Sequence, residues 1–165
     1  MDKQTFRALI QDAPIFLDGA TGSNLQKKGM PSGVCPEQWI LENKEVLVTL
    51  QKDFIDAGSR IIYAPTFTAN RIKLKEYGLE ENIRQMNHDL VAISKEAAGQ
   101  RAYVAGDITM TGEQLAPMGR LDFEELVAVY KEQIGCLVEA GVDLLVVETM
   151  MSLQETRAAV IAAKE

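Results

Sequence analysis

Acidic and hydroxyl side chains follow four short apolar segments of the chain. Asp18 comes after IFL, Thr66 after IIYAP, Asp107 after YVAG and Glu148 after LLVV. A lone Asp or Thr at such a place is most often a turn former or a helix cap. Glu148 is harder to explain in this way, because a carboxylate at the end of a buried strand is costly unless a partner or ligand pairs it.

Asp18 and Glu148 could hold one ligand together if their strand ends face the same mouth. Two neighbouring carboxylates repel each other, and an ammonium group between them would relieve that repulsion. The backbone N–H groups of Gly19 and Ala20 could receive an anionic group beside it. This combination predicts an amino-acid site. The alternative is a phosphate in the loop DGATGS, although no P-loop lysine follows that loop.

The elements that must position these residues are strands and helices in alternation. Four segments with continuous apolar character are predicted to be parallel strands buried on both faces, at residues 15–18, 60–64, 102–106 and 143–148. Apolar residues at helical spacing predict helices over residues 45–57, 80–98, 122–140 and 153–164. Asp122 and Glu125 have the spacing of a capping box, and Gly58 and Gly141 are predicted to end helices.

The βα order, repeated about four times, predicts an α/β fold with a parallel sheet and right-handed crossovers. The strand ends recur at near-regular intervals, and eight such units would form a TIM-type (β/α)8 barrel of about twice this length. An internal repeat supports this, because DAGSRIIYAPT at 56–66 aligns without gaps on EAGVDLLVVET at 139–149. We therefore expect residues 1–165 to be a single partial domain, the N-terminal half of such a barrel.

Composition narrows the class of protein. The 165 residues carry a net charge of −7, with 47% hydrophobic residues and no basic stripe, so a nucleic-acid partner is not expected. No apolar run is long enough for a membrane span, and the charged start does not resemble a signal peptide. We expect no membrane partner and a cytoplasmic location. The two cysteines, Cys35 and Cys136, are expected to be free thiols.

Four motifs, in order along the chain, carry a resemblance to a known family. LDGATGSNLQKKG, APTFTANRIKL, GDITMTGEQLAPMG and AGVDLLVVETM together resemble the homocysteine S-methyltransferase family, most closely its cobalamin-dependent branch. The likeness spans nearly the whole chain and implies a (β/α)8 barrel that binds homocysteine. The chain departs from the family pattern at Pro65, often Asn, and at Thr109 and Met110, which replace a Gly-Pro pair.

The resemblance also implies roles for individual residues. Asp18 and Glu148 would bind the amino group of homocysteine, and Gly19 and Ala20 would bind its carboxylate. Thr66 and Phe67 would line the pocket from the second strand end. All of these are substrate-binding rather than catalytic roles, and they act by orienting the substrate. Family members use a zinc ion held by cysteine thiolates, and methylcobalamin is the methyl donor that the closest branch implies.

The zinc ligands have no counterpart in this chain. The family's cysteines lie in the second half of the barrel, in part within a Gly-Gly-Cys-Cys segment, and neither Cys35 nor Cys136 matches a ligand position. His88, the only histidine, is expected at the surface. We therefore expect the homocysteine-binding part of a methyltransferase that makes methionine, inactive alone and partnered by the rest of the barrel and a cobalamin module.

Two alternatives remain open from the sequence. The chain could be a non-catalytic half-barrel that forms homodimers through exposed sheet edges. It could also be an open α/β domain that binds a small phosphorylated ligand at the DGATGS loop.

Overall fold

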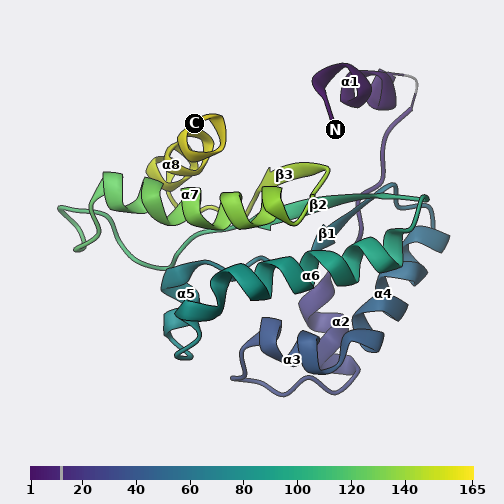
Figure 1. The fold of residues 1–165 in the computed structure, drawn as a ribbon, viewed down its shortest axis with the longest axis horizontal. Coiled ribbons are helices and arrows are strands. Elements are labelled where there is room, and N and C mark those ends of the chain that lie inside the picture. Colours follow the sequence, from purple (N-terminus) through teal and green to yellow (C-terminus); the bar gives the residue numbers. More distant parts are fainter. Residues whose placement is uncertain (12) are drawn as a thin grey trace.

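A three-stranded parallel sheet lies at the centre of the fold in the computed structural model, which describes residues 1–11 and 13–165 (Figure 1). Its strands are β1 (Ile61–Ala64), β2 (Tyr103–Ile108) and β3 (Leu144–Val147), in the order β1-β2-β3. Each of the three lies within two residues of a predicted strand. The register pairs residues 61–64 with 103–106, and 105–108 with 144–147, so all three carboxyl ends meet at one edge of the sheet.

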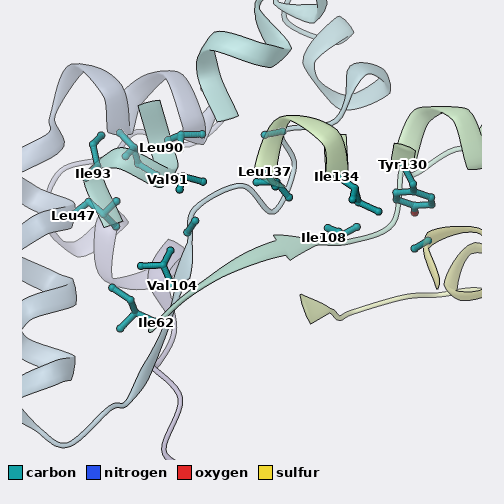
Figure 2. Packing of buried hydrophobic residues seen from close by; sticks show 14 of the residues in the cluster. Leu47, Ile62, Leu90, Val91, Ile93, Val104, Ile108, Tyr130, Ile134 and Leu137 are labelled. Carbon is teal, nitrogen blue, oxygen red and sulfur yellow. The ribbon is translucent and has the colours of Figure 1, made fainter. Parts of the chain in front are cut away.

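The long helices cover the sheet. They are α4 (Lys44–Asp56), α6 (Ile83–Ala98), α7 (Phe123–Glu139) and α8 (Leu153–Lys164), and they confirm the four predicted helices with small shifts at the ends. In α7 the fully buried Leu126, Tyr130 and Leu137 recur at helical spacing. Figure 2 shows apolar side chains of the sheet and of these helices gathered into the core.

Shorter helices that the sequence patterns did not predict fill the connections. They are α1 (Lys3–Gln11), α2 (Thr21–Lys27), α3 (Pro36–Glu42) and α5 (Arg71–Lys75). The 3-10 turn η1 (Glu80–Asn82) occupies the start of the helix predicted over residues 80–98. Helices α2 and α3 lie together with α4 on one side of the sheet (Figure 1). No helix in the described residues has the length and apolarity that a bilayer crossing requires.

The predicted strand at residues 15–18 is wrong in extent. Only a single parallel bridge joins Leu17 to Ile61, supported by hydrogen bonds from the Asp18 N–H to the Ile61 carbonyl and from the Arg60 N–H to the Phe16 carbonyl. Phe16 is 66% exposed and Leu17 47% exposed. The segment borders β1 on one side, and its side chains are largely exposed. It therefore pairs with the sheet at one point only. It nevertheless carries Asp18 to the carboxyl end of β1.

Two further predictions about the elements need correction. The Asp122 side chain makes no capping hydrogen bond, so the predicted capping box at the start of α7 is wrong. Asp122 contributes to the helix only through its backbone carbonyl, which accepts from the Leu126 N–H. Strand β3 is only half-buried along its length, because it is the edge strand of the sheet and is not covered on both faces. The predicted C-terminal glycines are confirmed, with φ of 112° at Gly58 and 85° at Gly141.

Candidate functional site

The sheet has one apolar face and one face with polar groups near its carboxyl edge. Ile62, Val104 and Ile108 belong to the core that the helices cover. Side chains alternate between the two faces of a strand, so Tyr63 and Asp107 project from the opposite face. Both line a cavity of about 720 Å³ at the carboxyl ends of the strands. This is the edge at which parallel α/β proteins place their ligands.

Five of the six residues predicted to bind substrate line this cavity together. They are Asp18, Gly19, Ala20, Phe67 and Glu148. Asp18 enters from the segment paired with β1, Phe67 from the loop after β1 and Glu148 from the end of β3. Thr149, the residue after Glu148, has a left-handed backbone conformation with φ of 50°, which is uncommon for any residue other than glycine. The chain therefore turns sharply at the point where Glu148 is presented.

The structure does not bring Thr66, the sixth predicted residue, to the cavity. Its side chain is fully buried. The hydroxyl donates to the Asp107 carbonyl at 3.0 Å and accepts from the Asp107 N–H at 3.1 Å. The Thr66 carbonyl in turn accepts from the Gln133 side chain at 2.8 Å. Thr66 thus joins the ends of β1 and β2 and fixes the backbone of Asp107.

Asp18 is tied to β1 through its side chain. Its Oδ2 accepts from the Tyr63 N–H at 3.0 Å. Burial raises the pKa of the Asp18 carboxyl to about 6, the Tyr63 hydrogen bond opposes that shift, and the charge of Glu148 adds to it. Perturbed pKa values of this kind cluster at functional sites, and a cation bound beside the two acids would favour their charged forms.

Asp107 appears in the sequence as one of four strand-end polar residues, but no role was predicted for it. It is 5% exposed, and its Oδ1 has no hydrogen-bond partner among the described residues. Burial, together with the charges of Glu148 and Asp18, raises the pKa of Asp107 to about 8. Burial and the same three acids raise the pKa of Tyr63. The sequence could have indicated Tyr63 and Asp107 as cavity residues, because side chains alternate between the two faces of a strand.

Glu37, for which the sequence pattern predicted no role, belongs to the cavity wall. It lies in the first turn of α3 and is almost completely buried. Its Oε1 accepts from the Thr68 N–H at 3.0 Å and from the Thr68 hydroxyl. Its Oε2 accepts from the Cys35 thiol. Glu37 therefore fastens α3 to the loop after β1 and holds the wall in place.

Gly19 and Ala20 bring two backbone amides to the cavity wall. Neither donates a hydrogen bond to another described residue, and both residues line the cavity. The side of Gly19 is close to α4, since a Cβ at this position would lie 2.8 Å from Cε1 of Phe54. A glycine at position 19 thus lets the backbone pass close to the Phe54 ring.

The two thiols do not fit the zinc site that the family resemblance implies. Cys35 and Cys136 are free and buried; Cys35 directly precedes α3, Cys136 lies on α7, and neither lines the cavity. Burial raises the pKa of Cys35 to about 11 and also raises the pKa of Cys136, so a zinc ion would have to displace a proton from each thiol. Within residues 1–11 and 13–165, no three His, Cys, Asp or Glu side chains are grouped to hold a metal.

The charge of the cavity favours a cation. Asp18, Asp107, Glu148 and Glu37 line it, and the described lining contains no Lys, Arg or His. A phosphate at the DGATGS loop would lie among these acids with no basic side chain to balance it. An ammonium group beside the acids and a carboxylate at the Gly19 and Ala20 amides would match both parts of the lining. The arrangement therefore suits the amino-acid end of a small molecule.

Comparison with known sequences points to one family. The family described as homocysteine S-methyltransferase matches residues 15–165. Methionine synthase from Mycobacterium tuberculosis (strain ATCC 25618 / H37Rv) is 26% identical over 161 residues, which cover 89% of this chain and 13% of that protein. Methionine synthase from Mycobacterium leprae (strain TN) is 25% identical over 161 residues, which again cover 89% of this chain and 13% of that protein. The chain thus spans about an eighth of the length of these two relatives.

Solved structures show the same fold. The homocysteine methyltransferase MmuM from Escherichia coli, in its oxidized form, superposes with a TM-score of 0.80 at 23% identity, over 96% of this chain and 61% of that one. Its metallated form gives a TM-score of 0.79 at 22% identity. With the βα order and the parallel strands, this likeness identifies the chain as part of a (β/α)8 barrel.

Proposed function

This chain belongs to the homocysteine S-methyltransferase family, and we propose on that premise that its cavity binds the amino-acid end of homocysteine. The chain would then be the homocysteine-binding part of a larger enzyme that methylates homocysteine to methionine. The observation that carries the proposal is the meeting of Asp18 and Glu148 with two available backbone amides in one cavity without a basic side chain.

Each end of the ligand would have its own partners. Asp18 and Glu148 would accept hydrogen bonds from the ammonium group, and the amides of Gly19 and Ala20 would donate to the carboxylate. Charge-assisted hydrogen bonds of this kind are stronger than neutral ones. Phe67 would cover the ligand from the loop after β1. These groups hold the substrate in position, and the rate benefit of such groups is one of orientation.

Activation of the sulfur would need residues outside this chain. Cys35 and Cys136 do not fit a zinc site, so we propose that the thiolate ligands of the zinc belong to the rest of the barrel. The resemblance of the four sequence motifs to the cobalamin-dependent branch of the family implies methylcobalamin, bound by a further module, as the methyl donor. We accordingly propose that residues 1–165 alone do not methylate homocysteine.

A second candidate function is self-association. Strand β3 is apolar, half-buried and at the edge of the sheet, and an exposed edge strand can pair with another chain. We propose that two copies can associate along this edge. Such association is compatible with homocysteine binding, because the cavity lies at the carboxyl ends of the strands.

Replacement of Asp18 tests the ammonium assignment. Asp18→Asn keeps the size of the side chain and removes its charge, and we expect L-homocysteine to bind about 10- to 100-fold more weakly in isothermal titration calorimetry. Asp53→Asn on the exposed side of α4 is the matched control and should bind as the wild type does. Equal affinities for the two variants would remove Asp18 from the site. No binding by the wild-type chain would contradict the proposed function.

A further inference from the structure

Asp107 is a buried carboxyl that the proposed ammonium contacts leave unused. Its backbone is fixed on both sides by the Thr66 hydroxyl. Its side chain lines the cavity, is 5% exposed, and has an oxygen, Oδ1, with no partner among the described residues. An unpaired polar atom in such a place is costly, so its presence at a ligand cavity calls for a functional explanation.

The groups that face Asp107 are acidic or neutral. Glu148 faces it from the end of β3, Asp18 from the segment beside β1, and the Tyr63 phenol from β1. The Thr66 hydroxyl lies behind its backbone, and Glu37 is on the wall formed by α3. The described lining contains no basic side chain. A carboxylate in these surroundings would be both desolvated and repelled, which favours the protonated acid.

An ammonium group in the cavity would reverse this preference. It carries three N–H donors and has no acceptor. Asp18 and Glu148 supply two carboxyls, and the unpartnered Oδ1 of Asp107 can supply the third acceptor. A protonated carboxyl is a poorer acceptor than a carboxylate, and a cation beside a carboxyl favours its charged form.

We propose that Asp107 carries a proton in the empty cavity and releases it when the ammonium group of an amino acid binds between Asp107, Asp18 and Glu148. The O–H bond of the Asp107 carboxyl breaks, the proton passes to solvent, and the carboxylate accepts a hydrogen bond from the ammonium group. The ammonium charge then offsets the carboxylate charge that Asp107 gains, and one proton appears in solvent for each ligand bound. This inference rests on the proposed function and adds a third acid to the site.

The pH range of the effect follows from the carboxyl itself. The pKa of Asp107 is about 8 in the chain without ligand, and an adjacent cation lowers a carboxyl pKa by about 1 to 3. Near pH 7 the group therefore changes from mostly protonated to mostly ionised upon binding. Because the bound state holds fewer protons, binding strengthens as the pH rises toward 8.

Calorimetry with L-homocysteine tests the proton release directly. Titrations at pH 7 in two buffers with different ionisation heats should show about half to one proton released per ligand. Between pH 6.5 and 7.5 the affinity of the wild type should rise roughly sixfold, whereas in Asp107→Asn it should rise less than about twofold and release should nearly vanish. The deaminated analogue 4-mercaptobutanoate should release no proton, because it brings no cation.

The outcomes separate this inference from the proposed function. Homocysteine binding to the wild type without proton release overturns the role of Asp107 and leaves the ammonium site standing. Equal release by the wild type and Asp107→Asn also overturns it. Failure of the wild type to bind at any pH overturns both proposals. If Asp107→Asn does not fold, as judged by circular dichroism, the proton count of the wild type decides by itself.

Discussion

Gly19 and Gly22 lie three residues apart, the first before α2 and the second inside it, and have different roles. At Gly19 a Cβ would meet the Phe54 ring at 2.8 and 3.1 Å, whereas at Gly22 nothing lies within 4 Å. Gly22 is inside α2 with ordinary helical backbone. Gly19 therefore makes room for the Phe54 ring of α4, whereas a glycine at position 22 is not needed for space.

The two glycines give a matched pair of variants. Gly19→Ala should destabilise the chain by about 1–3 kcal/mol and weaken homocysteine binding, since the Phe54 ring or the loop must move. Gly22→Ala should stabilise it by about 0.5–1 kcal/mol, because alanine is the better helix former. Urea unfolding measures both changes. Equal effects of the two substitutions would show that the contact with Phe54 does not constrain the loop.

At the scale of elements, one buried acid joins α8 to the loop after β2. Glu155 is 4% exposed, and its Oε1 accepts from both the N–H and the hydroxyl of Thr111, each at 2.9 Å. The Tyr130 hydroxyl donates to the Thr109 carbonyl at 3.0 Å. Ser152 caps α8 by accepting from the N–H groups of Gln154 and Glu155. These contacts bind the beginning of the loop to two helices.

Removal of the Glu155 carboxyl should loosen this junction. Glu155→Ala leaves the buried N–H and hydroxyl of Thr111 without acceptors, and we expect a loss of about 1–3 kcal/mol in the free energy of unfolding. Glu155→Gln keeps an acceptor oxygen and should lose less than half as much. Urea denaturation followed by circular dichroism measures both variants. If the alanine variant were as stable as the glutamine variant, the hydrogen bonds to Thr111 would not stabilise the fold.

The sequence could predict those elements that have a strong pattern. Residues 60–64, 102–106 and 143–148 are continuous apolar runs, and strands lie there. The shorter α2, α3 and α5 span too few turns for a helical period to show. Asp18 and Glu148 were found because they end strands, and the structure brings them into one cavity. The difference between Thr66, which is sequestered, and Asp107, which faces the cavity, depends on strand register and on hydrogen bonds between distant segments.

At the scale of the whole molecule, the sheet has an open edge. Strand β3 pairs with β2 on one side, and all four of its apolar residues are half-buried. The net charge of −7 opposes the approach of a second copy, but salt screens such repulsion. The balance between apolar contact and charge therefore decides whether the chain remains a monomer.

Sedimentation velocity over a range of concentrations tests the edge. We expect the wild type to sediment faster as its concentration rises, and more so at high salt, because screening favours contact. Val146→Lys places a charge on β3 and should keep the chain monomeric. Val138→Lys, at a position of α7 that is 60% exposed, is the control and should behave as the wild type does. Monomeric wild type at every concentration and salt level would contradict association through β3.

The burial of the two cysteines has a practical consequence for labelling. Alkylating reagents attack thiolates, and the raised pKa of Cys35 and Cys136 keeps both thiols protonated near neutral pH. A cysteine introduced at an exposed place on the cavity rim would therefore react first, without removal of the native pair. A fluorescent dye attached there would report ligand entry optically, in a chain whose own thiols stay unmodified.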